Sequence, residues 1–373
     1  MIKGHENFEL HNPVRVVYKK GGLEISREIS GFSNVLVICD PYVSQSDYFK
    51  RAISKYDSFF VFDKILPNPP CEMVDDIISI TCEYTKGNFN FNGVIGIGGG
   101  STLDTAKAVS SLIVSRGKLS EYLEGKKKFE NRLPLMLVPT TSGTGSEVTN
   151  VGVYTINGIK KPMTSKTFWA DIALVDPILT YSMPHRVAGT TGLDALTHAI
   201  ESYWATSTQP YTEGLALRAM KMIFENFKPS LNGEEWARDE MAIAATIAGI
   251  AFSQTRTTAA HAISFPITSF YNVEHGLACA LTLPSLIVWT YKHVKEKMDE
   301  LIQYLSLKNI DELAKKVEEL IEFAGFSTRL RDYSVKEEEL ENIARVSMEA
   351  RIIDLTPGQP RYEDVLEILK KIY

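Results

Sequence analysis

The chain has 373 residues, of which 44% are hydrophobic and 23% are charged. These values are near the averages for globular proteins, so they exclude a disordered chain, a collagen-like fibre and a small disulfide-rich protein, and the length predicts two packed domains. The 40 lysines and arginines against 46 acidic residues give a net charge of −6, which lacks the basic excess of nucleic-acid-binding proteins, so we expect small-molecule partners and no nucleic acid.

Residues 1–10 carry neither the apolar stretch of a signal peptide nor an Arg-rich amphipathic leader. The longest apolar run, residues 241–252, is shorter than the roughly 18–20 residues that a membrane span needs, and we expect it to be a buried helix. The cysteines lack CxxC spacing, which indicates free thiols in a reducing compartment. The sequence therefore predicts a cytoplasmic protein that does not bind a membrane.

Short apolar runs alternate with helical patterns in the first half of the chain. The runs that are apolar on both faces of a pleated strand, as in a buried parallel sheet, cover residues 34–40, 58–62, 93–97 and 133–138. Residues 73–85 and 102–114 carry apolar side chains at helical spacing, so strands and helices alternate as in an open α/β sheet. Asn157-Gly158, between β-prone residues, predicts a hairpin turn inserted in this half.

The second half of the chain is predicted to be helical. After Asp176-Pro177 the strand signal fades, and helical periodicity continues from about residue 185 to residue 373. Residues 311–321, for example, form a charged amphipathic pattern whose polar face we expect to be exposed to solvent. The sequence therefore predicts an α/β domain over residues 1–183 and an all-helical domain over residues 184–373.

Two loops that follow predicted strands are rich in glycine and hydroxyl groups. The first consists of Gly98, Gly99, Gly100 and Ser101 and opens a helix that we expect to start at Thr102. Because these glycines lack Cβ atoms, backbone amides can approach a pyrophosphate at the helix N-terminus; a plain tight turn is the alternative. The second loop, residues 139–146, also offers clustered hydroxyls and amides. Two such loops favour a long cofactor.

The helical half holds a carboxylate and three imidazoles that can serve as metal ligands. Asp194 and His198 are four residues apart, hence on one helix face, where both can reach one ion. His261 and His275 follow in a later segment. Such a set suits Fe²⁺, Zn²⁺, Co²⁺ or Mn²⁺, with no thiolate to select among them. Each histidine alone is more simply a structural residue, but three of the seven histidines beside an aspartate favour a metal site.

Several long motifs together resemble the iron-containing (group III) alcohol dehydrogenase family, and the resemblance runs over nearly the whole chain. The motifs are residues 98–101 with Asp104 and Lys107, residues 139–147, residues 191–201 and His275-Gly276. The resemblance implies the dehydroquinate-synthase-like fold. In that fold a Rossmann-like α/β N-terminal domain binds the dinucleotide, an all-helical C-terminal domain binds metal and substrate, and cofactor and metal meet in a deep cleft.

The resemblance also implies which residues bind metal and cofactor. The family's metal ligands fall on Asp194, His198, His261 and His275, and the expected ion is Fe²⁺ or Zn²⁺. The dinucleotide contacts fall on Gly98, Gly99, Gly100, Ser101, Thr140, Thr141 and Ser142, with further matches at Asn68, Lys161 and Leu179. Asp40 ends an early strand, where its carboxylate can bond a ribose hydroxyl and repel a 2′-phosphate. We therefore expect NAD, with NADP as the alternative.

Three residues near the ligands bear on the reaction. Many family members carry a histidine four residues after the third ligand, where this chain has Phe265, so a proton relay through that position is lost. Arg256 can grip an anionic substrate tail; the alternative is a salt-bridge residue on a helix surface or between domains. Cys279, one turn beyond His275, is expected to be a small core thiol; the alternative is a fifth metal ligand. No protein group beyond the ligands is expected to be catalytic.

The resemblance implies reversible hydride transfer between the nicotinamide and a small primary alcohol or aldehyde, with the metal as electrophile. The sequence around Arg256 is similar to family members linked with phosphonate metabolism, where the substrate is phosphonoacetaldehyde.

One alternative function is a dehydroquinate-synthase-like lyase or cyclase, which needs basic residues near the metal, and these are few between residues 190 and 276. Another alternative is a non-catalytic, metal-bearing structural subunit. The resemblance also suggests a homodimer in which edge strands near residues 14–18 pair.

Overall fold

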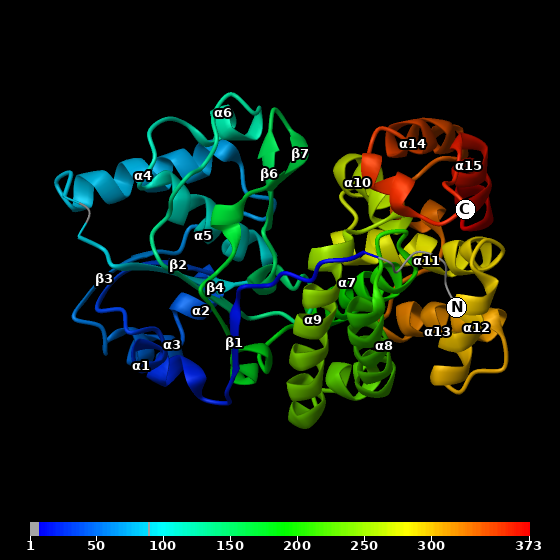
Figure 1. Cartoon of the computed structure of the whole chain (residues 1–373), viewed down its shortest axis with the longest axis horizontal. Helices are drawn as coiled ribbons and strands as arrows, with labels where there is room; N and C mark the ends of the chain where they lie inside the picture. The colour runs from blue at the N-terminus through cyan, green and yellow to red at the C-terminus, as the bar shows by residue number, and fades with distance from the viewer. Residues whose placement is uncertain (1–6, 89) are drawn as a thin grey trace. The chain divides into compact units, whose positions relative to one another are not determined.

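The computed structural model describes residues 7–88 and 90–373 and comprises two compact units (Figure 1). The α/β unit consists of Asn12–Thr141 and Gly145–Met183. The helical unit consists of Pro184–Tyr373, with Ser142–Thr144 and the described residues up to His11. Of the first ten residues, for which the sequence predicts no targeting leader, residues 1–6 lie outside the described part.

A parallel sheet forms the centre of the α/β unit. Within the described residues it has six strands in the order β1-β8-β5-β4-β2-β3, and every pairing is parallel. The strands are β1 (Arg15–Tyr18), β2 (Asn34–Cys39), β3 (Ser58–Phe62), β4 (Gly93–Gly98), β5 (Leu135–Pro139) and β8 (Ile172–Val175). The predicted open α/β sheet is confirmed. The sequence pattern did not reveal β8, because four residues are too few to show a period.

Alternate strand residues build apolar cores on the two faces of the sheet. On one face Leu36 of β2 packs with α4 (Cys71–Tyr84) and α5 (Gly100–Leu112). On the other face Val37 packs with α3 (Asp47–Ile53). Because helices cover both faces, β2 is apolar along almost its whole length, which is why the sequence shows continuous apolar runs and not alternation.

Smaller elements complete the α/β unit. Its other helices are α1 (Ser26–Ser30), α2 (Pro41–Ser44) and α6 (Leu119–Leu123), and its antiparallel hairpin joins β6 (Val151–Ile156) to β7 (Ile159–Thr164). Asn157 and Gly158 between these strands have φ of 52° and 75°. Two consecutive residues with positive φ are the requirement of a tight hairpin turn, so the predicted hairpin is confirmed.

The strand order reverses beside β2. From β2 the chain continues to β3 on one side, whereas β4 and β5 follow on the other side. Since parallel strands end at the same edge of the sheet, the residues after β2, β4 and β5 gather there, and this is where open α/β sheets bind ligands. The backbone N–H of Asp40 donates to the Ile97 carbonyl at 2.8 Å, which holds the end of β2 beside the end of β4.

Helix α5 begins two residues earlier than predicted. Gly98 is the last residue of β4, Gly99 is the N-cap, and α5 starts at Gly100 where the sequence analysis expected Thr102. The Gly99 carbonyl accepts hydrogen bonds from the backbone N–H groups of Thr102 and Leu103. Because glycine is a weak helix former, a prediction from residue type alone starts this helix too late in the sequence.

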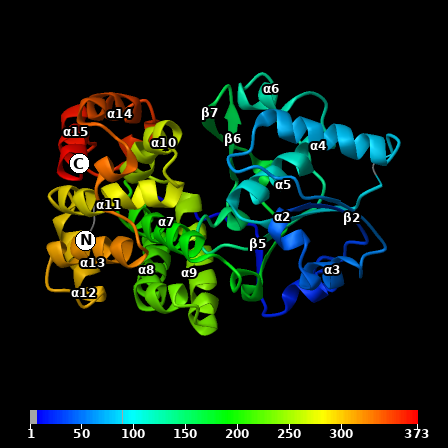
Figure 2. The ribbon, with the colours of Figure 1, turned by 180° about the vertical axis from the view of Figure 1, so that it is seen from behind.

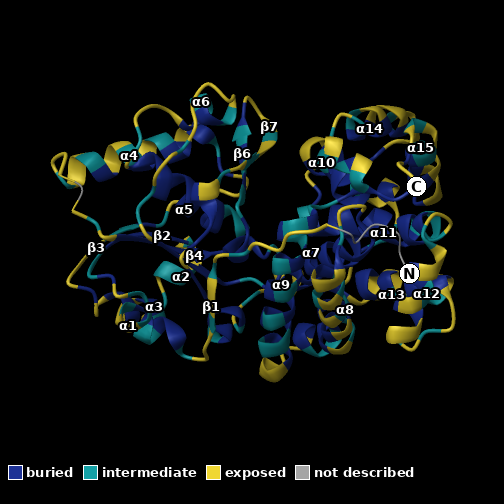
Figure 3. Cartoon of the chain, viewed as in Figure 1, coloured by how far each residue is buried: buried dark blue, intermediate teal, exposed yellow. Residues whose placement is uncertain are grey.

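The helical unit is built around one central helix. Its helices are α7 (His185–Trp204), α8 (Pro210–Leu231), α9 (Glu235–Thr255), α10 (Ala259–Tyr271), α11 (His275–Tyr291), α12 (Lys295–Tyr304), α13 (Ile310–Phe323), α14 (Leu340–Ser347) and α15 (Tyr362–Lys371). Helix α7 packs against α8, α9 and α11 (Figure 2). Each residue from Gly192 to Trp204 is buried (Figure 3). A helix that is buried all round is the core of its unit, so side chains on α7 are shielded from water.

The apolar run at residues 241–252 lies in α9, as expected for a core helix. No helix formed by residues 7–88 or 90–373 combines the length and apolar character needed to cross a lipid bilayer. The four cysteines all belong to the described residues and are free thiols, as predicted.

Candidate active site

Helix α7 presents an aspartate and a histidine on one face. Asp194 and His198 are only 3% and 5% exposed, and His198 Nδ1 lies 4.0 Å from Asp194 Oδ2. The ring of Phe252, on α9, stacks on His198 with ring centres 4.1 Å apart and planes 12° apart. The helical spacing thus places both predicted ligands side by side, and Phe252 holds one of them in a fixed orientation.

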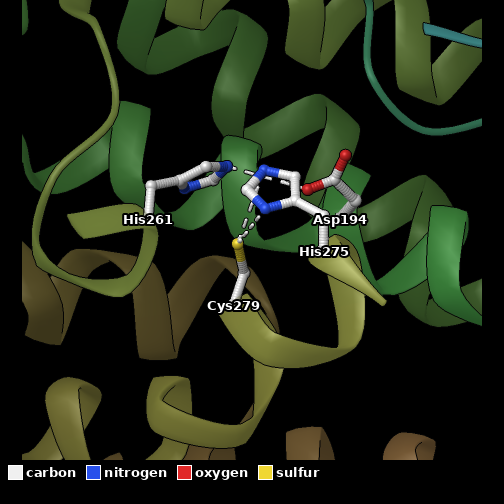
Figure 4. A group of neighbouring side chains, drawn as sticks. All are labelled: Asp194, His261, His275 and Cys279. Atoms are coloured by element: carbon white, nitrogen blue, oxygen red, sulfur yellow. Dashed lines mark hydrogen bonds and ion pairs between the residues drawn. The ribbon is translucent and has the colours of Figure 1, made fainter. Parts of the chain in front are cut away.

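Two further histidines reach this pair from the next helices. His261, in the first turn of α10, points its Nε2 to within 3.0 Å of His198 Nε2 and 3.7 Å of Asp194 Oδ1. His275, the first residue of α11, meets the His261 ring edge-on at 5.4 Å between centres. Figure 4 shows Asp194, His261 and His275 converging. The structure therefore brings together the four residues that the sequence predicts as metal ligands.

Cys279 also faces this cluster. Its Sγ lies 3.9 Å from each ring nitrogen of His275, and Asp194, His261, His275 and Cys279 each offer a donor atom within 4.8 Å of the others (Figure 4). Burial would raise the pKa of this thiol, but the neighbouring His261 and His275 lower it to about 7. The thiol is buried, as expected of a small core residue, and it also lies close enough to the predicted ligands for the alternative of a fifth ligand.

Two polar atoms in the cluster test whether a metal fits there. Asp194 Oδ1 and His198 Nδ1 are buried and make no hydrogen bond within the described chain. Burial opposes ionisation of Asp194, but the histidines around it, His198 first, hold the pKa of its carboxyl well below the usual value. Burial lowers the pKa of His198 to about 4. An ionised carboxylate and an uncharged imidazole are ligands for Fe²⁺ or Zn²⁺, so the residues fit the predicted ion.

Glu201 adjoins the cluster and received no role from the sequence. It is fully buried on α7, and its Oε2 accepts a hydrogen bond from His261 Nδ1 at 2.5 Å. A signal for it exists, since Asp194, His198 and Glu201 follow the i, i+4, i+7 spacing of one helix face. That spacing says which residues share a face, but not which partner the third residue meets.

Arg256 lies just after α9, five residues before His261. Its backbone has φ 67° and ψ 174°, a region that is essentially restricted to glycine and costs other residues about 1–3 kcal/mol. Burial lowers the pKa of its guanidinium, and within residues 7–88 and 90–373 no acidic group pairs with it. The salt-bridge alternative therefore finds no partner among the described residues.

Phe265 lies beside the fourth predicted ligand. Its ring is nearly parallel to that of His275, with ring centres 6.4 Å apart and planes 12° apart. A phenyl ring neither donates nor accepts a proton, so this position supplies no proton relay.

In the α/β unit, the first glycine loop, residues 98–101, offers backbone N–H groups as candidate cofactor contacts. A Cβ atom built on Gly98 would lie 2.5 Å from Thr102 Cβ, whereas one built on Gly99 would lie 3.5 Å from the nearest atom, Cγ2 of Thr141. Gly98 is therefore required by packing, whereas a Cβ atom at Gly99 would make only ordinary van der Waals contact with the protein. The loop ends at the N-terminus of α5, where backbone N–H groups and the helix dipole favour a phosphate.

Other predicted cofactor residues flank this loop. The Asn68 backbone N–H donates to Ser101 Oγ at 3.1 Å, and the Thr140 N–H donates to the Gly98 carbonyl at 3.0 Å, so the predicted contacts near β4 and β5 are adjacent. Thr141 follows Thr140. Asp40 Oδ1 accepts a hydrogen bond from the Tyr42 N–H at 2.8 Å, which fixes the carboxylate at the end of β2.

The remaining cofactor candidates are Ser142, Lys161 and Leu179. Ser142 belongs to the helical unit, and its buried Oγ has no hydrogen-bond partner within the described residues. Lys161 is exposed on β7. Leu179 is buried in the apolar core that covers one face of the sheet. These residues are not gathered around the first glycine loop by any contact that the structure describes.

Known protein families match both parts of the chain. The model described as iron-containing alcohol dehydrogenase matches residues 13–177, and that of the Fe-containing alcohol dehydrogenase family, C-terminal, matches residues 188–373. The chain belongs to the iron-containing alcohol dehydrogenase family. This membership makes the enzyme an oxidoreductase that acts on CH–OH groups, as the motifs predicted.

Individual relatives cover almost the same length. The enzyme is 32% identical to long-chain-alcohol dehydrogenase 1 of Geobacillus thermodenitrificans, over 86% of this chain and 84% of the relative. It is 30% identical to a sulfoacetaldehyde reductase of Bilophila wadsworthia, over 95% and 96%. The crystal structure of a sulfoacetaldehyde reductase from Bifidobacterium kashiwanohense in complex with NAD⁺ superposes with a TM-score of 0.92 at 29% identity, covering 98% of both chains. The predicted family and fold class are confirmed, and the dehydrogenase is favoured over the lyase and the structural subunit.

Proposed function

We propose that this enzyme uses NAD and one divalent ion, Fe²⁺ or Zn²⁺, to interconvert a small primary alcohol and its aldehyde. The observation that carries the proposal is the convergence of the buried Asp194, His198 and His261 with the partly buried His275. Two of their atoms, Asp194 Oδ1 and His198 Nδ1, make no hydrogen bond within the described residues. In this proposal residues 1–183 form the dinucleotide-binding domain and residues 184–373 the domain for metal and substrate.

The chain's own residues hold and orient the reactants. Asp194 and the three histidines hold the ion, which supplies an electrophile for the oxygen of the alcohol or aldehyde when it is bound. The backbone N–H groups of residues 98–101 bind the pyrophosphate of NAD, whose nicotinamide accepts or donates the hydride. Phe265 excludes water next to His275 and offers no proton, so the proton of the alcohol leaves by another route.

Asp40 is proposed to select NAD over NADP. Its carboxylate is fixed at the end of β2, at the edge where the strand order reverses. A carboxylate that bonds a ribose hydroxyl repels a 2′-phosphate at the same place. We expect Asp40→Gly to narrow the preference for NAD by about 5- to 30-fold, corresponding to about 1–2 kcal/mol. Dissociation constants for NADH and NADPH measure this, and a wild-type enzyme that prefers NADPH would contradict it.

The substrate is proposed to carry an anionic tail, as phosphonoacetaldehyde does. The supporting observation is Arg256, whose half-buried guanidinium has no acidic partner in the described chain. The backbone of Arg256 is itself strained, and it lies five residues before His261 in the sequence. Strained backbone persists where the surrounding structure enforces it, and it concentrates at functional sites. Two relatives named as sulfoacetaldehyde reductases act on an aldehyde with a sulfonate tail, which has similar charge and size.

We also propose a cytoplasmic homodimer. Strand β1 lies at one edge of the sheet, and its Val16 and Tyr18 are 40% and 45% exposed. An exposed apolar edge strand favours pairing with another strand, and a second copy of the chain would cover it symmetrically. Light scattering at micromolar concentration is expected to give twice the mass of the chain; the mass of a single chain would argue against the dimer.

The function is tested by following NADH spectroscopically. The metal-stripped enzyme is reloaded separately with Fe²⁺ or Zn²⁺ and assayed with phosphonoacetaldehyde, sulfoacetaldehyde and an uncharged aldehyde of similar length. We expect NADH consumption with the reloaded enzyme and faster turnover of the anionic aldehydes. If neither ion supports NADH or NADPH consumption with any aldehyde, nor the reverse reaction with any alcohol, the proposed function is wrong.

A further inference from the structure

We propose that Glu201 is a positioning residue that sets the tautomer and orientation of His261 and thereby determines how tightly the metal ion is held. The proposal rests on the metal site proposed above. It adds a residue that lies behind the ligands and takes no direct part in holding the ion. The carboxylate is fully buried on α7, one turn beyond His198.

The contacts of Glu201 all lie in the segment that begins α10. Oε1 accepts hydrogen bonds from Thr258 Oγ1 at 2.6 Å and from the Ala260 N–H at 2.7 Å. Oε2 accepts from the Thr258 N–H at 3.0 Å and from His261 Nδ1 at 2.5 Å. Each oxygen thus has two donors, so both are occupied without a metal ion. Glu201 therefore serves as an acceptor for the protein and not as a fifth ligand.

These contacts fix which nitrogen of His261 faces the ligands. A carboxylate accepts but does not donate a hydrogen bond, so Nδ1 carries a proton, and the neutral ring that a metal ion requires keeps its lone pair on Nε2. That Nε2 is the atom 3.0 Å from His198 Nε2 and 3.7 Å from Asp194 Oδ1. In metal sites, a carboxylate that accepts from the outer ring nitrogen orients a histidine ligand and increases its basicity.

The same carboxylate also holds the backbone around Arg256. The strained backbone of Arg256 is followed within two to four residues by the Thr258 and Ala260 N–H groups that donate to Glu201. Trp204, also on α7, donates from Nε1 to Thr258 Oγ1 at 2.9 Å. A negative charge at the start of α10 further stabilises that helix. Glu201 therefore secures the start of α10, including His261, against relaxation of the strained turn.

The test compares two identical substitutions in the helical unit. Glu201→Gln removes the charge and one pair of acceptor sites. Glu213→Gln makes the same chemical change at the carboxylate that pairs with the buried Lys297, away from the predicted ligands in the described contacts. The probe is Zn²⁺, titrated in competition with a chromophoric chelator, and the affinity for NAD and the thermal melting temperature are measured on the same samples.

We expect Glu201→Gln to weaken Zn²⁺ binding by about 10- to 100-fold, with NAD affinity unchanged. Glu213→Gln is expected to lower the melting temperature and to leave Zn²⁺ affinity at the wild-type value. Wild-type Zn²⁺ affinity in Glu201→Gln would overturn the proposal, as would an equal loss in both variants, because the loss would then follow stability. His261→Ala distinguishes failure of the metal site from failure of the role proposed for Glu201. If His261→Ala binds Zn²⁺ as tightly as the wild type, the proposed metal site is wrong.

A measurement on the unaltered enzyme covers the case in which Glu201→Gln does not fold. Proton–nitrogen NMR of the Zn²⁺-loaded enzyme, with His261→Ala for assignment, reports which ring nitrogen carries hydrogen. We expect a protonated Nδ1 and an unprotonated Nε2 at His261. A proton on Nε2 would mean that Glu201 does not set the tautomer and would overturn the proposal.

Discussion

The two units of the enzyme build their candidate sites in opposite ways. In the helical unit, buried side chains from α7 and α10 converge with the partly buried His275 of α11. In the α/β unit, the loop after β4 offers backbone N–H groups, and its usefulness depends on side chains being absent. Truncating a side chain should therefore impair the candidate metal site in the helical unit. Adding a side chain to a glycine should impair the candidate dinucleotide site in the α/β unit.

The largest effect is expected from taking a ligand out of the helical unit. His261→Ala, or removal of the ion by a chelator, should lower kcat/KM by roughly 10³-fold or more, because a metal electrophile supplies several kcal/mol of stabilisation. The α/β unit should keep its fold, since its two apolar cores do not include the predicted ligands. Steady-state kinetics and circular dichroism measure the two quantities. Full turnover by the chelated enzyme would refute a Lewis-acid role.

The same contrast explains what the sequence could predict. The proximity of Asp194 and His198 could be predicted because residues four apart share one face of a helix, and their side-chain types make them candidate ligands. Glu201 shares that face, yet most of its partners are backbone N–H groups and a hydroxyl, which carry no sequence signal. The strained backbone of Arg256 could not be predicted either, because the residue type does not determine the backbone angle φ.

The α/β unit shows the same limit. The long apolar runs of β2 and β4 and the Asn157-Gly158 turn follow local rules and were predicted, whereas β8 has only four residues and no visible period. Leu179 matched a family contact, and the structure shows it packed in the apolar core on one face of the sheet. A motif thus locates a segment, whereas the packing of each side chain depends on residues distant in the sequence.

Arg256 offers a sharper test, because two substitutions separate its side chain from its backbone. Arg256→Ala and Arg256→Gly both remove the guanidinium, so each should lower kcat/KM for phosphonoacetaldehyde by about 10- to 150-fold and change it little for an uncharged aldehyde. Only glycine accepts φ 67° and ψ 174° without strain. Arg256→Gly should therefore unfold at a higher temperature than Arg256→Ala, by about 1 kcal/mol in the free energy of unfolding.

Equal kinetic losses on both aldehydes would mean that Arg256 supports the fold or the cofactor. In that case the anionic substrate would be abandoned in favour of a general small aldehyde. A melting temperature for Arg256→Gly at or below that of Arg256→Ala would separately contradict the assigned strain, whatever the kinetics show.

The glycine loop tests the other half of the comparison, where atoms are added. Gly99→Ala adds a methyl group that meets nothing closer than 3.5 Å in the protein, so stability should change little while NAD affinity falls about fivefold. Gly98→Ala drives its methyl group into Thr102 and should instead destabilise the fold by about 1–3 kcal/mol. Thermal melting and NAD titration distinguish the two. Unchanged NAD affinity in Gly99→Ala would argue that the loop is a plain turn.

The smallest effect is expected at Cys279, although its thiol faces the ligands. In the proposed site Asp194 and the three histidines supply four donors, so a thiolate would compete with the substrate oxygen for the ion. Cys279→Ser should therefore change Zn²⁺ affinity by less than about threefold, a small fraction of the 10- to 100-fold range for residues that tune a metal site. The Co²⁺-loaded wild-type enzyme checks this independently. A thiolate-to-cobalt charge-transfer band in its near-ultraviolet spectrum, lost in Cys279→Ser, would show that Cys279 binds the ion. That result would contradict our proposal that the ion keeps a position free for the substrate oxygen.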